Sequence, residues 1–109
     1  MLMAHLLKQA GLKSVAAGSI GDSFAKWVAL DDQDFYALEI SSFQLDGIVD
    51  FAPHIAILTN ITPDHLDRYE YKFDNYIKSK FRIAENQTEK DYLIYDADDP
   101  VITDWLAKH

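Results

Sequence analysis

The most constraining feature of this chain is a series of short apolar runs separated by segments with helical spacing. Runs 35–40 and 55–59 are almost continuously apolar, as strands covered on both faces should be. Runs 14–17 and 92–95 are shorter strand candidates. Strands that alternate with helices predict βαβ units, and therefore an α/β fold with a mostly parallel sheet flanked by helices.

Helices are expected around these strands. The first covers residues 1–10. The second is opened by Asp22 or Ser23 and turns Phe24, Trp27 and Val28 inward. The third covers residues 74–87 with Asp74 as its cap, and the last is capped by Asp99, begins with Pro100 and ends near Lys108. Right-handed crossovers bring the carboxyl ends of parallel strands to one edge, where ligands bind. Four polar segments are expected there: Gly18-Ser19, Glu39, Asn60 to His65 and Asp96 to Asp99.

Composition excludes several classes of protein. The 109 residues suffice for one domain, and 18 Asp+Glu against 10 Lys+Arg give a net charge of -8. This charge argues against a nucleic-acid groove, although backbone N–H groups and a bound cation can still hold a small phosphate. The absence of cysteine excludes disulfides and thiolate zinc sites. No apolar run approaches the roughly 20 residues of a membrane helix, so we expect a cytoplasmic protein.

Glu39 stands near the end of an apolar strand, where a buried carboxylate needs a partner. A salt bridge or a capped neighbouring helix would supply one. A Mg²⁺ ion, which prefers oxygen ligands, would also do so. Ser41, Ser42 and Gln44 follow at once and could bind phosphate or sugar oxygens. Two serines after a strand are weak evidence when taken alone.

Lys80 is placed unusually. On a wheel of about 100° per residue, it falls near the middle of an apolar face made by Phe73, Tyr76, Ile77, Phe81 and Ala84. Lys78 and Arg82 are expected to point away. An inward lysine must snorkel to an edge, find an anionic partner or change its charge state. His65 is less informative, because a lone histidine is more often structural than catalytic.

Three features of the sequence occur together. They are Glu39-Ile-Ser-Ser-Phe-Gln-Leu45, Asn60-Ile-Thr-Pro-Asp-His-Leu-Asp-Arg-Tyr69, and a lysine fifteen positions after His65. This combination closely resembles the central domain of the Mur ligases, ATP-dependent enzymes that add amino acids to the peptidoglycan precursor. The form of the motifs is similar to that of the members that add D-glutamate. The resemblance runs over nearly all of the chain, to Asp98-Asp99-Pro100.

The resemblance implies metal-binding and catalytic roles. Glu39 would bind the Mg²⁺ that bridges the phosphates of ATP. His65 would bind a second Mg²⁺ near an acyl phosphate. Lys80, carbamylated by CO₂, would become an anion that helps to hold this second metal.

The resemblance also implies contacts with the UDP-N-acetylmuramoyl-L-alanine substrate. Ser41 and Gln44 would contact it, and Asn60 would lie near the same edge in a supporting role. Ser19, in Gly18-Ser19-Ile20-Gly21, stands where the family usually has Asn, so that substrate contact departs from the pattern.

The resemblance leaves parts of a ligase unaccounted for. No G-x-x-x-x-G-K-[ST] phosphate loop occurs in the sequence. We therefore interpret residues 1–109 as a single partial domain, without the phosphate loop and without the C-terminal domain that would bring D-glutamate. Such a fragment is expected to be inactive by itself.

The expected reaction of the parent enzyme has two steps. ATP phosphorylates the carboxylate of UDP-N-acetylmuramoyl-L-alanine, and the amine of D-glutamate then displaces the phosphate to form an amide. A folylpolyglutamate synthase-like ligase is an alternative, which the Ser-Ser-Phe-Gln run argues against. A non-catalytic binding module with a Mur-like fold is a second alternative.

Overall fold

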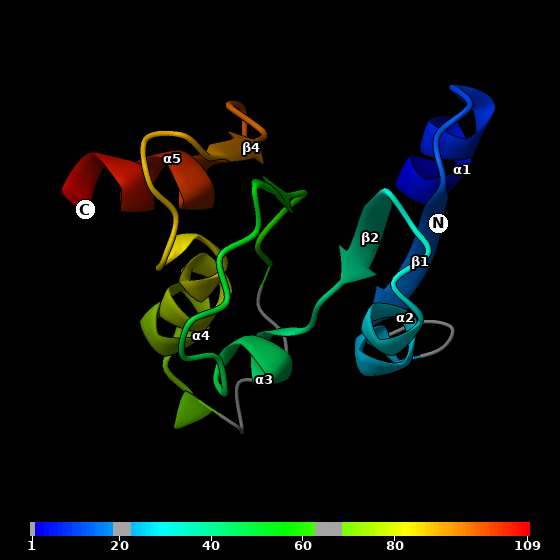
Figure 1. Ribbon diagram of the computed structural model, residues 1–109. Helices are drawn as coiled ribbons and strands as arrows, with labels where there is room; N and C mark the ends of the chain where they lie inside the picture. The colour runs from blue at the N-terminus through cyan, green and yellow to red at the C-terminus, as the bar shows by residue number, and fades with distance from the viewer. Residues whose placement is uncertain (1, 19–22, 63–68) are drawn as a thin grey trace. The chain divides into compact units, whose positions relative to one another are not determined.

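A computed structural model describes residues 2–18, 23–62 and 69–109. The chain divides into two compact units, Met1–Ser41 and Ser42–His109, which we call the N-terminal and C-terminal units (Figure 1). Each is described by itself. No helix among the described residues has the length and apolar character needed to span a bilayer.

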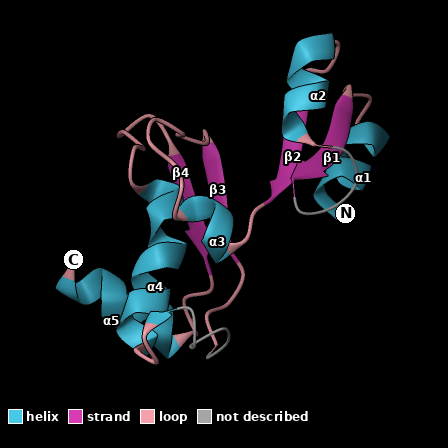
Figure 2. Ribbon diagram, turned by 90° about the horizontal axis from the view of Figure 1, so that it is seen from below, coloured by secondary structure: helices cyan, strands magenta, loops and turns pink. Residues whose placement is uncertain are grey.

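The N-terminal unit is a helix followed by one βαβ unit (Figure 2). Its elements are α1 (Leu2–Gln9), β1 (Ser14–Gly18), α2 (Phe24–Leu30) and β2 (Phe35–Glu39). β1 and β2 pair in parallel, from Ser14 opposite Phe35 to Gly18 opposite Glu39. These elements agree with the sequence-based prediction to within a residue or two.

Local chemistry explains where these elements begin and end. The Ser23 hydroxyl accepts a hydrogen bond from the Lys26 N–H at 3.3 Å, so Ser23 acts as the predicted N-cap of α2. The other predicted cap, Asp22, lies outside the described residues. Gly18 has φ +97°, and a Cβ there would lie 2.3 Å from the Glu39 carbonyl oxygen. Glycine thus permits the close approach of the two strand ends.

The inward face predicted for α2 is only partly correct. Phe24 meets the ring of Tyr36 on β2 edge-on, with ring centroids 5.4 Å apart. Val28, four residues later on the same helix face, is exposed, contrary to the prediction. The Trp27 side chain lies outside what the structure describes.

The C-terminal unit contains a second βαβ unit. Its elements are α3 (Ser42–Leu45), β3 (Ile55–Leu58), α4 (Phe73–Phe81), the 3₁₀ turn η2 (Arg82–Ala84), β4 (Tyr92–Tyr95) and α5 (Pro100–Lys108). β3 and β4 pair in parallel, from Ile55 opposite Tyr92 to Leu58 opposite Tyr95. The described strands thus form two parallel pairs flanked by helices, which confirms the α/β class.

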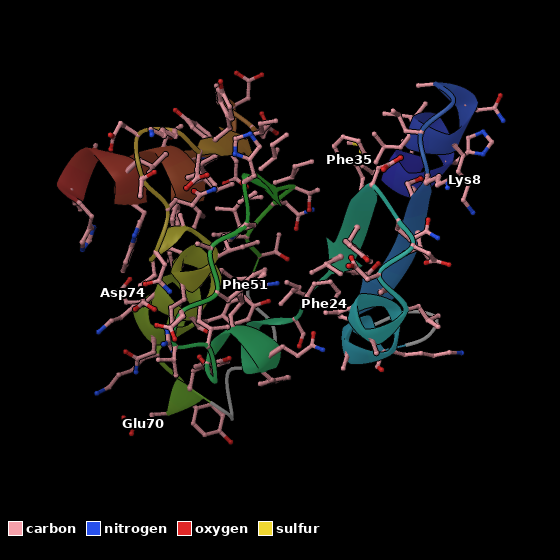
Figure 3. The ribbon with its side chains drawn as sticks, viewed as in Figure 1. Lys8, Phe24, Phe35, Phe51, Glu70 and Asp74 are labelled. Atoms are coloured by element: carbon pink, nitrogen blue, oxygen red, sulfur yellow. The ribbon has the colours of Figure 1, made fainter. Side chains whose placement is uncertain are left out.

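The two long helices of this unit differ in how they begin. The Asp99 carboxylate accepts hydrogen bonds from the N–H groups of Val101 (2.9 Å) and Ile102 (3.4 Å), which confirms it as the cap of α5. The predicted cap of α4 is wrong, because the N-cap position is Lys72, which makes no side-chain cap. Asp74 instead lies in the first turn of α4 (Figure 3). Phe73 packs against the core and draws the helix start upstream.

A hydrophobic core fills the C-terminal unit. Its buried members are Leu58, Ile61, Tyr69, Tyr76, Ile77 and Ile102. Partly buried side chains pack around them: Phe43, Phe73, Phe81, Ile83, Leu93, Val101, Trp105 and Leu106. This core fixes α4, the helix that carries Lys80, against the elements that surround it.

Candidate functional site

Glu39 is the last residue of β2 and lies opposite Gly18. Its side chain is exposed, so the buried carboxylate expected at the end of this strand is not found. Ser41 lies two residues further on and is half-buried. Ser19 and His65, two other predicted site residues, lie outside the described residues.

The segment after β2 folds into α3, a single helical turn that the sequence did not predict. Ser42 and Leu45 are buried on its inner side, whereas Gln44 is exposed. The Ser42 carbonyl accepts a hydrogen bond from the Asp46 N–H at 3.0 Å, and the Ser79 hydroxyl oxygen also lies 3.0 Å from this carbonyl oxygen. The turn therefore directs Gln44 outward and ties Ser42 to α4.

Lys80 is half-buried on α4. Its Nζ lies 5.4 Å from the centroid of the Tyr76 ring, within the range of a cation–π contact. Among the described residues, no carboxylate forms an ion pair with it. The predicted inward face is correct for Tyr76 and Ile77, which are buried, and Ser79 joins them by facing α3.

Arg82 does not point away from the unit, contrary to the prediction. Its guanidinium donates hydrogen bonds to the carbonyl oxygens of Asp46 (2.6 Å) and Ile48 (2.9 Å), and it pairs with Glu85 at 3.3 Å. The helical wheel assumed 3.6 residues per turn, but the chain tightens at Arg82 into a 3₁₀ turn. This change of pitch directs Arg82 to the loop after α3.

Asn60 is exposed and lies two residues after β3. The N–H of the next residue, Ile61, donates to one Asp99 carboxylate oxygen at 3.2 Å. The other carboxylate oxygen of Asp99 caps α5. A single side chain thus joins the segment that follows β3 to the start of the helix that follows β4.

Comparison with known proteins decides the family. The family profile described as the Mur ligase middle domain matches residues 2–109. The chain belongs to the Mur ligase family.

Several Mur ligases resemble the chain closely. A UDP-N-acetylmuramoylalanine–D-glutamate ligase of Christiangramia forsetii is 68% identical over 108 residues, which are 99% of this chain and 24% of that protein. Ligases of the same name from Porphyromonas gingivalis and Bacteroides fragilis are 50% and 52% identical, over 100% and 99% of this chain. The chain spans 24% of the length of each of these relatives.

The predicted site residues are distributed over both units. Glu39 and Ser41 belong to the N-terminal unit, and Gln44, Asn60 and Lys80 belong to the C-terminal unit. Within the described residues, no three histidine or acidic side chains gather into a metal site. The joint site of Glu39, His65 and Lys80 stays a prediction.

Sequence reasoning missed three side chains that hold α3. Asp46, Tyr69 and Ser79 form a hydrogen-bonded cluster in the C-terminal unit. For Ser79 the sequence did carry a signal, because this residue falls between the apolar positions Tyr76, Ile77 and Phe81 of the inner helix face. Asp46 carried no comparable signal, since its partners lie more than twenty residues away along the chain.

Proposed function

We propose that the chain is part of an ATP-dependent ligase that joins D-glutamate to UDP-N-acetylmuramoyl-L-alanine in peptidoglycan synthesis, in the cytoplasm. The observation that carries this proposal is the 68% identity, over 108 residues, to a relative named as a D-glutamate ligase. We also propose that residues 1–109 form part of one middle domain of that ligase. In the reaction, ATP phosphorylates the muramoyl-alanine carboxylate, and the D-glutamate amine displaces the phosphate.

The substrate-binding roles fall to polar side chains after two strands. Gln44 and Asn60 are exposed in the C-terminal unit, and both are proposed to bind the UDP-N-acetylmuramoyl group. Ser41 and Ser19 are proposed to contact the same substrate. Serine at position 19 is shorter than the asparagine usual in the family, and it carries one hydroxyl in place of an amide.

The metal-binding roles fall to Glu39, His65 and Lys80. The exposed carboxylate of Glu39 suits a hard cation such as Mg²⁺, which prefers oxygen donors. When bound, Mg²⁺ would neutralise the charge of the phosphoryl oxygens. Carbamylation of Lys80 would replace its ammonium group by an oxygen donor of opposite charge. The contact with the Tyr76 ring favours the cation, so the carbamate needs a compensating charge at this position.

Binding the phosphates of ATP needs a phosphate-binding loop, which this sequence does not contain. It contains no glycine-rich loop with a lysine that could hold the β- and γ-phosphates. The 109-residue chain alone is therefore expected to release no phosphate from ATP in the presence of Mg²⁺, UDP-N-acetylmuramoyl-L-alanine and D-glutamate. Turnover by this chain at the usual enzyme scale of about 1–10³ per second would contradict this account of ATP binding.

Lys80 offers the sharpest test in the full-length ligase. Lys80→Arg keeps the charge but cannot form a carbamate, so it should lose most of kcat. Lys80→Ala should also be poor, and acetate in the buffer should restore part of its activity by supplying the missing anion. The matched control is Lys78→Ala, because Lys78 is exposed on the same helix and should keep its activity.

The outcomes separate the candidate functions. An active Lys80→Arg variant would end the carbamate role but leave the ligase assignment standing. Turnover with a folate substrate in place of the muramoyl one would favour the folylpolyglutamate synthase-like alternative. A full-length protein that binds the muramoyl substrate but never releases phosphate would be a binding module.

A further inference from the structure

The Asp46 carboxylate lies immediately after α3 and receives hydrogen bonds from two hydroxyl groups. Tyr69 donates to its Oδ2 at 2.8 Å, and the Ser79 hydroxyl lies within hydrogen-bonding distance of its Oδ1. Tyr69 and Ser79 are both buried. The two donors come from different segments, since Tyr69 precedes α4 and Ser79 lies within it.

Counting protons assigns the donors. Besides the Tyr69 hydroxyl oxygen at 3.1 Å, the one proton of the Ser79 hydroxyl has two nearby acceptors, the Asp46 carboxylate and the Ser42 carbonyl. The Ser42 carbonyl already accepts the Asp46 N–H within α3. A hydrogen bond to a carboxylate is also the stronger of the two. Ser79 and Tyr69 therefore both donate to Asp46, one to each oxygen.

Other contacts hold the same short segment. Phe43 stacks on the Tyr69 ring, with centroids 5.9 Å apart and planes within 6° of parallel. Arg82 donates to the carbonyl oxygens of Asp46 and Ile48 rather than to the Asp46 carboxylate. The carboxylate is thus held by hydroxyl groups, which are directional donors.

A single turn of helix cannot hold its own position. α3 has four residues, far fewer than the roughly 12–15 at which an isolated helix becomes even marginally stable. Its position therefore depends on contacts with the rest of the unit. Gln44 projects from this turn to the outside, and Lys80 directly follows Ser79 on α4.

We propose that Asp46 is a positioning residue of the ligase site: through Tyr69 and Ser79 it fixes α3, and with it Gln44, relative to Lys80. This inference rests on the proposed function, in which Gln44 contacts the muramoyl substrate and Lys80 acts at the reacting phosphate. In this proposal Asp46 acts through α3 and not by contact with a substrate. Its effect is expected on binding of the muramoyl substrate and not on binding of ATP.

The main test is Tyr69→Phe in the full-length ligase. This change keeps the ring that stacks on Phe43 and removes one donor to Asp46. We expect the KM for UDP-N-acetylmuramoyl-L-alanine to rise about tenfold and the KM for ATP to change less than twofold. Tyr71→Phe is the matched control, because Tyr71 is 78% exposed and should leave both constants unchanged.

A double-mutant cycle tests whether the effect passes through Asp46. Ser79→Ala should also raise the KM for the muramoyl substrate several-fold. In an Asp46→Asn background, Tyr69→Phe should cost clearly less than in the wild type, because its acceptor has already been altered. If Tyr69→Phe raised the KM for the muramoyl substrate equally in both backgrounds, the proposal would be overturned. A lower Tm with every KM unchanged would also overturn it and leave a purely structural role.

A readout without activity separates this inference from the proposed function. The Asp46 N–H donates to the Ser42 carbonyl at the end of α3. In the 109-residue chain, Tyr69→Phe should increase the hydrogen-exchange rate of this amide at least tenfold. Tyr71→Phe should not change it. Unchanged exchange in Tyr69→Phe would overturn the positioning of α3 whatever the enzyme does. A full-length wild type without ligase activity would overturn the proposed function, and with it the role of Asp46 in catalysis.

Discussion

The N-terminal and C-terminal units are built on the same backbone plan but bury different side chains. In the N-terminal unit the buried side chains are small: Ala4, Ser14, Ala17 and Ala37. Many of its large apolar residues are exposed, among them Leu2, Leu6, Leu30 and Phe35. The C-terminal unit buries large residues such as Leu45, Leu58, Tyr76 and Ile102. Similar parallel pairing of the backbone therefore coexists with unequal burial of apolar surface, the main source of stability.

The units also differ in how side chains hold the loops. In the C-terminal unit, the loop between α3 and β3 is tied down from one side. Its carbonyl oxygens accept hydrogen bonds from Arg82, from Asn86 at Val49 (2.8 Å), and from Gln87 at Pro53 (3.0 Å). These bonds satisfy backbone groups that no regular element pairs. These side chains thus hold the irregular loop in place between the end of α3 and the start of β3.

The largest expected effect tests the difference in burial. Ile102 is 0% exposed, and Ile102→Ala should lower the free energy of unfolding by about 2–5 kcal/mol. The matched change in the N-terminal unit is Leu6→Ala, where Leu6 is 50% exposed; we expect a loss of no more than about 1 kcal/mol. Denaturant unfolding of the 109-residue chain measures both. Equal losses would contradict the contrast between the units.

A smaller effect tests the N-terminal unit through its backbone. Gly18→Ala should destabilise this unit by about 1–3 kcal/mol, because the new Cβ would meet the Glu39 carbonyl and φ is positive. Gly11→Ala is the control, since φ is also positive there but nothing lies within 4 Å of a new Cβ. Its cost should be about 1 kcal/mol. Hydrogen exchange should show faster opening of β1 and β2 in the first variant, with β3 and β4 unchanged.

The smallest effect concerns acid. Hydrogen bonds from the Thr88 N–H (2.9 Å) and then from His54 (3.1 Å) lower the pKa of Asp91 below its ordinary value of 3.8. A carboxyl whose pKa is lower in the folded state stabilises the fold above its unfolded pKa, and this contribution is lost as the pH falls through the folded value. Asp91→Asn should therefore slightly lower the stability of the fold at pH 7, and it should make the loss of stability with falling pH less steep below about pH 4. Thermal melts from pH 2 to 7 measure this, and an unchanged slope would contradict it.

Much of the fold could be predicted because local patterns fix it. Apolar runs located the strands, and Asp99-Pro100 located the start of α5. The errors came where distant contacts decide local structure. α3 is one turn that Asp46 and its partners hold, and no periodicity shows in four residues. Arg82 was misplaced because the wheel continued a pitch that the chain changes.

The candidate site was less predictable than the fold. The wheel placed Lys80 on the inner face of α4, and the structure leaves it half-buried beside Tyr76. The pattern of an apolar strand gave Glu39 a burial that the end of β2 does not provide. The proposed role of Glu39 depends on partner groups from elsewhere, which no local sequence pattern specifies. Only the joint motifs, and not the individual residues, pointed to a ligase.

Each parallel strand pair is closed by a single crossover, and the two crossovers differ in length. Ser14 and Phe35 are 21 residues apart, whereas Ile55 and Tyr92 are 37 apart. The entropy of loop closure makes the longer crossover costlier by about 0.5 kcal/mol. The hydrogen bonds and buried rings of the C-terminal unit therefore also offset a larger loss of chain entropy. By sequence separation alone, β1 and β2 meet sooner than β3 and β4 during folding.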